Sequence, residues 1–490
     1  MLAQKSVAKV RDAGIEGVAI PPGVQGAPAP SPHLARVLGR WDLILLFVVA
    51  VANLNIVPAI AASGALTLWI WGLAFIAYFW PQGVAVTELA RRWPGEGGVY
   101  LWTCINFGEG HGFFAGWCYW LANVVYLPTV LLSCVGVGLY IFSPSVQSLA
   151  SSERVTGGMA LALLLGLLVL NVRGQQMGKW MTNIGGVGTV GGGILVCLLA
   201  AWTLHGQGSA AHLHDLNPRG ASWRLIAVFG TICYSLQGLD LASIMGDEIR
   251  EPRKVLPNAI VWGGIISGTI YLAVTFAMLV ALPHSQIGVL SGVLQAVSTM
   301  ADRAHLRMIV PPLALFEFLA ILGTASAWFS GSARLPFVAG IHRYLPPSLG
   351  KIHPKFHTPY VALGLFALLS AMLILMSYAA ASVGEAYLTL LSIAVILQMV
   401  PNLYMFAALW KTAALDAGPS RRGFLRWSAV SGLTASGLGI CLAFVPTGEV
   451  LSVWAYEAKL ISVSILVVGF ALFFYFRAQM QRGAVAPAKH

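Results

Sequence analysis

Long runs of apolar residues recur along most of the chain, and short polar segments separate one run from the next. A helix needs roughly 20 apolar residues to cross the hydrocarbon core of a bilayer. By this criterion we predict an all-α polytopic membrane protein with about twelve transmembrane helices. Their approximate limits are residues 42–62, 66–90, 112–142, 156–171, 178–203, 223–247, 256–282, 309–335, 359–378, 384–410, 427–446 and 454–477.

The first and the sixth predicted helices are interrupted by residues that helices avoid. The first contains Asn-Leu-Asn-Ile-Val-Pro from Asn53 to Pro58, and the sixth contains Tyr-Ser-Leu-Gln-Gly-Leu-Asp from Tyr234 to Asp240. In lipid, a backbone group without a hydrogen bond is costly, so a broken helix persists only where it lines a polar cavity or a ligand. A matched pair of broken helices is the best pointer in a sequence to the substrate site of a transporter.

The break in the first predicted helix is suited to an anionic group. Pro58 has no N–H, so the carbonyl of Leu54 is expected to lose its helical partner. Asn53 and Asn55 are poor helix formers because their amides compete for backbone groups. We expect the freed backbone N–H groups from Asn53 to Ile56 to face a cavity, where the N-terminus of a half-helix binds carboxylates. The alternative is a proline kink in which the two asparagines bond to neighbouring helices.

The break in the sixth predicted helix contains a carboxyl group. Gly238 relaxes the helix, and Ser235 offers the backbone an alternative hydrogen bond. A carboxylate at the depth of Asp240 costs about 3 kcal/mol on insertion scales, so acids within the membrane are functional candidates. We expect Asp240 to take up and release a proton during the cycle. The alternative is that Asp240 caps the half-helix that follows it.

The third predicted helix contributes a weaker candidate surface. Tyr119 and Asn123 share one face of this helix with other aromatic residues. Aromatic side chains at helical spacing are more often packing residues than ligand contacts. The amide of Asn123 among them favours a polar face that lines the site.

A run of glycines from Gly185 to Gly193 lies within the fifth predicted helix. It is not a phosphate-binding loop, because no Lys-Ser/Thr pair follows it. Gly188 and Gly192 have the spacing of two small residues on one helix face, which predicts close packing against another helix.

Composition supports a membrane protein and sets its orientation. The 490 residues are 58% hydrophobic and 10% charged, whereas soluble domains contain about 25% charged residues. The net charge of +11 is scattered between apolar runs, so we expect no nucleic-acid partner. Most of the 29 Lys and Arg residues fall on loops that are cytoplasmic if the N-terminus is inside. The positive-inside rule therefore predicts cytoplasmic N- and C-termini in a multi-pass protein of the plasma membrane.

The domain organisation follows from the positions of the two breaks. Each break opens a block of five predicted helices, at about 42–203 and 223–410. An odd number of helices per block gives the second block the opposite orientation, which is an inverted repeat. We expect a disordered cytoplasmic tail at 1–38, a transport core at 39–410, two additional transmembrane helices at 411–478 and a cytoplasmic tail at 479–490.

Two segments resemble signatures of the amino acid–polyamine–organocation superfamily. One runs from Asp240 to Pro257, and the other runs from Arg91 to Tyr100 and is followed by Phe107-Gly108. The similarity extends over about residues 40–410. It implies the five-plus-five inverted-repeat fold of the leucine-transporter type and secondary transport of amino acids or related amines.

The resemblance also implies roles for individual residues. Asp240 matches an acidic position tied to gating or protonation, while Tyr234 and Ser235 match the unwound segment whose carbonyls hold the amino end of the substrate. Trp328 resembles a substrate-lining aromatic residue of the eighth helix, and Tyr119 resembles an aromatic gate of the third. The chain departs from the pattern in two places, because the first break has no glycine and the fifth helix has no lysine near Gly188.

Three functions follow, in order of preference. The first is a secondary active transporter of amino acids that works by alternating access and is proton-coupled or exchanging. The second is a polyamine or amine transporter in which Asp240 pairs with a ligand ammonium. The third is a membrane-embedded enzyme, for which no catalytic cluster is visible.

The expected partners are small amino acids or amines, the lipid bilayer and protons as a candidate coupling ion. The six cysteines show neither metal-ligand spacing nor a paired Cys-x-x-Cys, so we expect free thiols, no metal and no cofactor. The sequence leaves open whether the protein is a monomer or a homodimer. The predicted binding residues are Asn53, Leu54, Asn55, Ile56, Tyr119, Asn123, Tyr234, Ser235, Gly238 and Trp328, with Asp240 for gating or proton coupling.

Overall fold

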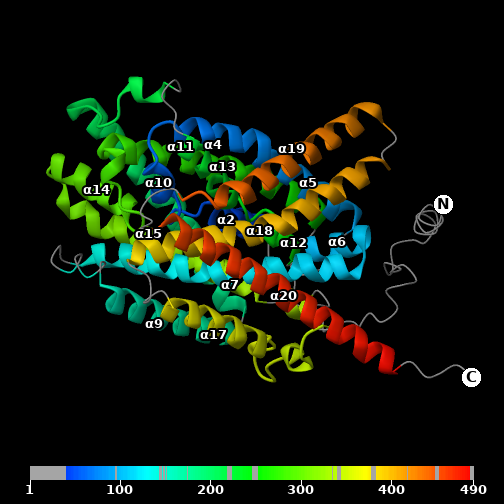
Figure 1. Cartoon of the computed structure of the whole chain (residues 1–490). Helices are drawn as coiled ribbons and strands as arrows, with labels where there is room; N and C mark the ends of the chain where they lie inside the picture. Colours follow the sequence, from blue (N-terminus) through cyan, green and yellow to red (C-terminus); the bar gives the residue numbers. More distant parts are fainter. Residues whose placement is uncertain are drawn as a thin grey trace, which may run out of the picture.

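Helices make up every regular element that the computed structural model describes (Figure 1). The described residues are 40–93, 97–142, 146, 149, 152–173, 175–217, 223–244, 252–333, 335–338, 344–376, 382–415, 418–446 and 452–485. The predicted tail at 1–38 lies outside them, whereas the second predicted tail begins within a helix that continues to Val485. The α-helices are α2 (Arg40–Val51), α3 (Val57–Ala61), α4 (Thr67–Ala74), α5 (Trp80–Arg92), α6 (Val99–Phe107), α7 (Glu109–Gly138), α9 (Glu153–Arg173), α10 (Gln175–Gln207), α11 (Trp223–Ser235), α12 (Leu241–Ile244), α13 (Pro252–Ala281), α14 (Gly292–Arg303), α15 (Val310–Ser332), α16 (Leu335–Val338), α17 (Tyr360–Met376), α18 (Val383–Ala413), α19 (Pro419–Ala443) and α20 (Val453–Val485).

The predicted all-α polytopic architecture is confirmed. Eight helical segments of the described chain are long and apolar enough to cross a membrane, and three shorter apolar helices accompany them. Each of the twelve predicted segments contains at least one helix of the structure. The second segment is continuous from α4 to α5 through a π-helix, η1 (Phe75–Phe79). The sequence did not predict α6, because it is too short to cross a membrane, or α14, because it is short and mixed in polarity.

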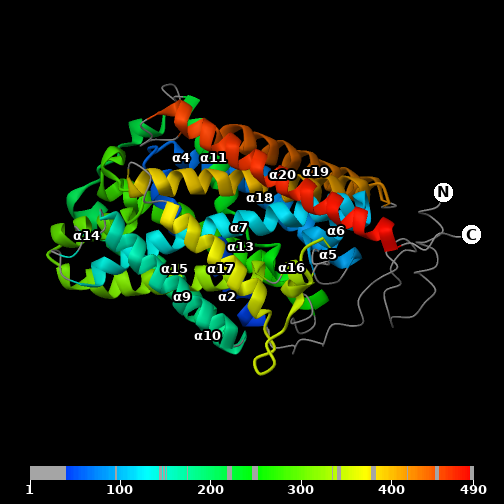
Figure 2. The ribbon, with the colours of Figure 1, turned by 60° about the horizontal axis from the view of Figure 1, so that its bottom comes forward.

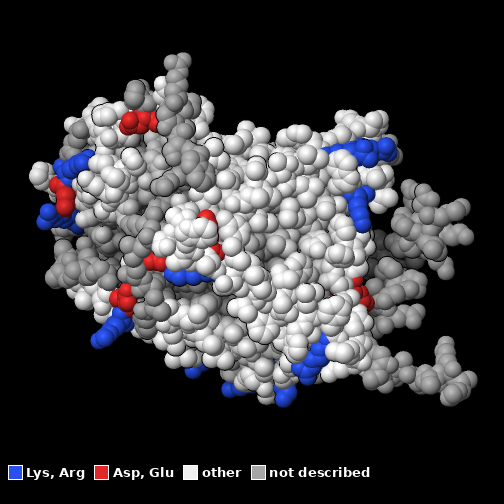
Figure 3. Space-filling view, viewed as in Figure 1, with Lys and Arg blue, Asp and Glu red and all other residues white. Residues whose placement is uncertain are grey.

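The helices run mostly along the long direction of the molecule (Figures 1 and 2). In both views α14 lies at one end, while α5, α6 and the end of α20 lie at the other. Figure 3 shows a broad area without charged side chains in the middle of one face, and charged groups gather mainly toward its edges. Such an uncharged belt is what the hydrocarbon region of a bilayer requires.

Both predicted breaks are present in the structure. The first helix stops at Val51 and resumes at Val57, and the sixth stops at Ser235 and resumes at Leu241. α2 packs against α13, α10 and α15, so its broken end lies inside the bundle. The residues of both breaks are buried.

The predicted close packing of the glycine-rich helix is confirmed at Gly188. A Cβ atom on Gly188 would lie 2.7 Å from the carbonyl oxygen of Phe316 in α15. A Cβ atom on Gly185 would lie 2.7 Å from the Cα of Gly323 in the same helix. Real Cβ atoms do not approach backbone this closely, so the absence of side chains allows α10 and α15 to touch. This contact holds α15 beside the broken end of α2.

The glycine contact gives a first test. Replacing Gly by Ala inside a helix normally stabilises it, by up to about 1 kcal/mol. Gly188→Ala is expected to do the opposite and to lower the free energy of unfolding by about 1–3 kcal/mol, because the new methyl group overpacks against α15. Gly191→Ala is the matched control, since a Cβ atom there would have 3.9 Å to its nearest neighbour. Thermal unfolding of the purified protein measures both, and equal stability of the two variants would contradict the packing argument.

Candidate functional site

The break in the first helix leaves three carbonyl groups at the end of α2 without helical partners. Thr324 Oγ1 of α15 donates a hydrogen bond to the carbonyl oxygen of Val49 at 3.0 Å. The indole N–H of Trp328, one turn further along α15, donates to the carbonyl oxygen of Ala50 at 3.1 Å. The hydroxyl of Tyr271 in α13 bonds to the carbonyl oxygen of Val51. Side chains from two other helices therefore supply the donors that the broken helix lacks.

The carbonyl oxygen of Leu54 has no helical partner at Pro58, as expected. This oxygen accepts a hydrogen bond from the backbone N–H of Val57 at 3.2 Å. The chain forms tight turns through the break, so its own N–H groups reach carbonyls two or three residues earlier. Pro58 begins the following helical turn, where its missing N–H costs nothing.

The break in the sixth helix lies directly against the end of α2. Gly238 has a φ of +128°, a conformation that residues with side chains rarely adopt. A Cβ atom on Gly238 would lie 2.9 Å from the carbonyl carbon of Ala50 and 3.0 Å from its oxygen. Glycine is therefore required at this position for both its conformation and its close approach to the first break.

Two side chains tie the breaks together across this contact. The Tyr271 hydroxyl accepts a hydrogen bond from the N–H of Asn53 at 2.8 Å and also approaches the carbonyl oxygen of Ser235 at 2.7 Å. The side-chain amide of Asn53 donates to Ala50 at 3.1 Å and to Ser235 at 3.4 Å. A hydroxyl has one proton, so Tyr271 can donate to only one carbonyl at a time.

Asn55 presents hydrogen-bond donors without partners. Its carbonyl oxygen accepts from the Tyr387 hydroxyl at 2.5 Å, and its side-chain oxygen accepts from the Tyr126 hydroxyl at 3.4 Å. Its Nδ2 has no partner. The expectation that the backbone N–H groups from Asn53 to Ile56 are free is wrong for three of them, because Asn53, Leu54 and Ile56 donate to carbonyls within the turns, and only the N–H of Asn55 makes no such bond. Asn55 is 1% exposed, so these donors are shielded from water.

Acceptors without partners occur at both breaks. Asn53 Oδ1 lacks a hydrogen-bond partner, and neither carboxyl oxygen of Asp240 makes a hydrogen bond of good geometry. The donors directed at this carboxyl group are the hydroxyl of Tyr119 and the backbone N–H groups of Gly238 and Asp240. Leaving a buried donor or acceptor unpaired costs about 1–3 kcal/mol, and more for a charged group. Unpaired buried groups also occur on α13, α15, α18 and α19. Their position where the two breaks meet, and not their number, makes this the candidate site for a polar ligand.

The other predicted residues surround the same region or bond within their own helices. The rings of Tyr234 and Trp328 both make edge contacts with Tyr126, with centroids 5.4 and 6.4 Å apart. The amide of Asn123 donates to the carbonyl of Tyr119, and the hydroxyl of Ser235 donates to that of Ile232. Leu54 and Ile56 are buried within the break.

The sequence did not identify the tyrosines that organise the site. Tyr271 and Tyr387 each bond to the first break from more than 200 residues away. The only local signal is a tyrosine within an apolar run, whose hydroxyl needs a partner when buried.

A polar network on the second helix was also missed. Gln82 Nε2 donates to Gln237 Oε1 at 2.8 Å, and Gln237 Nε2 bonds to the Tyr78 hydroxyl. All three side chains are buried. This network joins α5 and η1 to the break in the sixth helix.

Comparison with known proteins identifies relatives over most of the chain. The model of a family described as amino acid permease matches residues 38–475. An uncharacterised transporter of Legionella pneumophila is 25% identical over 455 residues, which cover 89% of this chain and 96% of that protein. A branched-chain amino acid permease of Bacillus subtilis is 26% identical over 357 residues, covering 69% and 74% of the two chains. A probable agmatine/putrescine antiporter of Lactococcus lactis is 22% identical over 317 residues, covering 64% and 66%.

Tyr271→Phe tests the contact between the two breaks. The variant keeps the ring, which stacks on Trp71 with centroids 4.4 Å apart, and removes the hydroxyl. It is expected to lower the free energy of unfolding by about 1–3 kcal/mol, because one buried carbonyl loses a donor and the N–H of Asn53 loses an acceptor. Tyr360→Phe is the matched control, since Tyr360 is 37% exposed. If Tyr271→Phe and Tyr360→Phe unfold at the same temperature, the hydroxyl of Tyr271 does not hold the two breaks together.

Proposed function

This chain belongs to the amino acid permease family, within the amino acid–polyamine–organocation superfamily, and we propose that it is a secondary active transporter of amino acids. Alternating access in such a transporter exposes one central site to each side of the membrane in turn. The family and the relatives named above are transporters and not enzymes, which agrees with the sequence prediction. The membrane-embedded enzyme is therefore set aside.

The observation that carries this proposal is the polarity of the unpaired groups at the two breaks. Donors without partners gather at Asn55, and acceptors without partners gather at Asn53 and Asp240. An amino acid has a carboxylate that needs donors and an ammonium that needs acceptors. The two breaks together therefore complement a zwitterion, with the carboxylate at Asn55 and the ammonium toward Asp240.

The proposed architecture is the leucine-transporter type. Ten spans, beginning with α2 and ending with α18, form two inverted five-helix repeats in this proposal, and α19 and α20 are additional spans. The direct contact of Gly238 with Ala50 supports it, because each break opens one repeat and the two meet at the centre. The distribution of Lys and Arg supports cytoplasmic N- and C-termini in the plasma membrane.

Asp240 is the proposed coupling residue. It is fully buried and has no basic partner among the described ion pairs. A buried carboxyl group in this setting binds a proton more readily than it carries an unpaired charge. Loading and release of that proton with the substrate would couple amino acid movement to the proton gradient.

An amine or polyamine carrier is the second candidate. The carboxyl oxygens of Asp240 are acceptors without a good hydrogen bond, which suits a ligand ammonium as well as a proton. One relative bears the name of a probable agmatine/putrescine antiporter. In that case the donors at Asn55 would face no ligand carboxylate.

The contribution of the ligand's carboxylate to binding distinguishes an amino acid transporter from an amine carrier. A thermal-shift screen of the purified protein finds the amino acid that binds, because a ligand of the native state raises its stability. The amine formed from it by decarboxylation is expected to bind at least about tenfold more weakly, since a charge-assisted hydrogen bond contributes ~1.5–3 kcal/mol. Equal or tighter binding of the amine would favour the amine carrier.

Asn55→Asp locates the carboxylate within the site. The substitution replaces the Nδ2 donor with a negative oxygen and keeps the size of the side chain. The substitution should lower the affinity for the amino acid by about tenfold or more. The affinity for the decarboxylated amine should stay the same or rise. If the affinities for both ligands fall equally, the carboxylate of the amino acid does not bind at Asn55.

Asp240→Asn tests proton coupling. The variant keeps the shape of the side chain but cannot lose a proton, so substrate binding should persist while the pH dependence of uptake becomes flat. Uptake into liposomes at several external pH values measures this. An unchanged pH profile would exclude Asp240 as the coupling residue.

A further inference from the structure

The second transmembrane segment is attached to α19 at two separate points. Near its middle, Ser431 Oγ donates a hydrogen bond to the carbonyl oxygen of Ala77 at 2.7 Å. Ala77 lies in the π-helix η1, where the helical hydrogen-bond pattern is altered. At the end of α5, Arg421 of α19 forms an ion pair with Glu88 at 2.7 Å.

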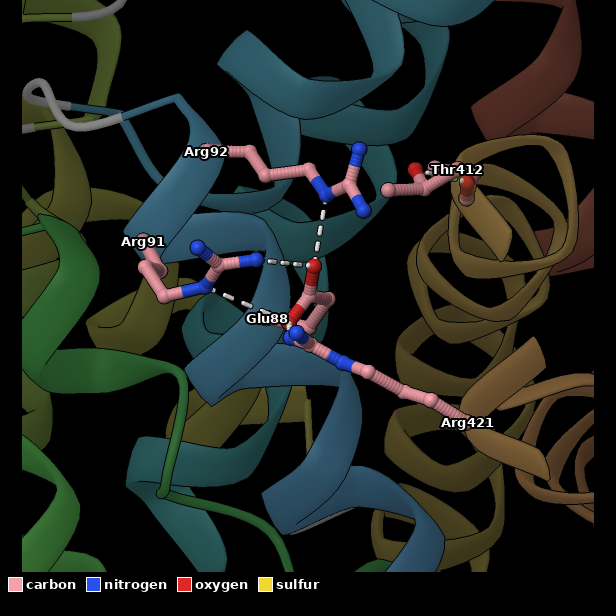
Figure 4. A network of polar contacts seen from close by, with 6 residues as sticks. Glu88, Arg91, Arg92, Thr412 and Arg421 are labelled. Atoms are coloured by element: carbon pink, nitrogen blue, oxygen red, sulfur yellow. Dashed lines mark hydrogen bonds and ion pairs between the residues drawn. The ribbon is translucent and has the colours of Figure 1, made fainter. Parts of the chain in front are cut away.

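Glu88 is the centre of a cluster of three arginines (Figure 4). Its carboxylate accepts from Arg91 at 2.9 Å and from Arg92 at 2.5 Å, in addition to Arg421. The Glu88 side chain is only 6% exposed, whereas those of Arg91 and Arg421 are about half exposed. A buried carboxylate is thus surrounded by cations that reach into solvent.

The three ion pairs respond differently to movement of the helices. Arg91 and Arg92 lie on the same helix as Glu88, so these pairs persist wherever α5 moves. Arg421 comes from another helix, so its pair alone depends on the distance between α5 and α19. Breaking a buried pair is normally very costly because it leaves one charge uncompensated. Here Glu88 keeps two partners, and the guanidinium of Arg421 returns to water.

The cluster is mechanically connected to the candidate site. Gln82 lies six residues before Glu88 on α5, roughly 9 Å along the axis at 1.5 Å per residue. Its amide donates to Gln237 in the break of the sixth helix. α19 also packs on the first half of that helix, since a Cβ atom on Gly230 would lie 2.8 Å from the carbonyl oxygen of Gly439. Movement of α5 away from α19 would therefore displace Gln237 and the break in the sixth helix.

We propose that the Glu88–Arg421 ion pair is a reversible latch that holds this end of the substrate pathway closed, with Arg421 as a positioning residue of the transport cycle. In the structure the latch is formed and the residues of both breaks are buried. When this end of α5 separates from α19, the ion pair itself is released at low cost, because Glu88 keeps Arg91 and Arg92 as partners. α19, which lies outside the proposed ten-helix core, thereby takes part in transport.

The native thiol of Cys233 reports the state of the latch. Cys233 is fully buried in α11, two residues before this helix ends at Ser235. In the parent protein the other five native cysteines are replaced, and the hydrogen bond between Gln82 and Gln237 is kept. The reaction rate of this thiol with a water-soluble maleimide is measured on purified protein in detergent, where both ends of the molecule are accessible.

Arg421→Gln, added to this parent, is expected to speed labelling about two- to fivefold, the range over which a solvent-exposed ion pair shifts an equilibrium. Arg421→Lys should restore most of the parent rate, because it keeps the charge. Raising the salt concentration should speed labelling with Arg421 present and have little effect in Arg421→Gln. Arg426→Gln is the matched control, since Arg426 lies on the same helix and contacts the ring of Trp410, 5.1 Å away.

Equal labelling rates in Arg421→Gln and Arg426→Gln, or slower labelling in Arg421→Gln, would overturn the latch. Faster labelling accompanied by the same loss of thermal stability in both variants would also overturn it, because that result reports general loosening. The latch rests on the proposed alternating-access function, but labelling requires no substrate. A protein that binds no amino acid therefore refutes the proposed function without changing the outcome of this test.

Discussion

The carbonyl groups at the broken end of α2 are the constraint on which the rest of the structure depends. A helix that stops within a membrane exposes carbonyls that water cannot reach, and each one needs a donor from the protein. Thr324, Trp328 and Tyr271 supply those donors from α15 and α13. Two neighbouring helices are thereby fixed in position around the first break.

Close approach of backbones makes these hydrogen bonds possible. α10 and α15 touch through Gly185, Gly188 and Gly323, which brings α15 to α2. Gly238 allows the second break to contact Ala50 directly. Since no side chain intervenes at this point, the backbones of the two breaks are in direct contact.

Close apolar packing keeps some pairs of helices together, whereas polar contacts allow other pairs to separate. Glycine contacts lose favourable packing steeply when they separate, so they suit pairs of helices that stay together. Ion pairs between partly exposed groups contribute little net stability and exchange readily with water. The cluster at Glu88 combines both properties, because two arginines stay with the carboxylate while a third belongs to another helix. The third arginine adds little stability to a carboxylate that already has two partners, and it suits a contact that opens.

The sequence by itself determined the membrane-spanning helices, both breaks and the presence of a buried acid at Asp240. These features are local, since apolar length, helix-breaking residues and a charge within an apolar run are visible in any window of about 20 residues. It also placed Asn53 and Asn55 at the site. It did not predict that tight turns engage the N–H groups of Asn53, Leu54 and Ile56, because the turn geometry of the break cannot be read from the position of Pro58 alone.

Only the tertiary structure decided which polar groups at the site have hydrogen-bond partners and which do not. Tyr271 and Tyr387 reach the first break from 218 and 332 residues away, and Arg421 reaches Glu88 from 333 residues away. No local pattern specifies such pairs, because they depend on which helices lie side by side. The donors of Asn55 remain free because the turns of the break engage the N–H groups of Asn53, Leu54 and Ile56 instead. Helix formation is a property of short segments, whereas satisfaction of buried polar groups is a property of the whole packed chain.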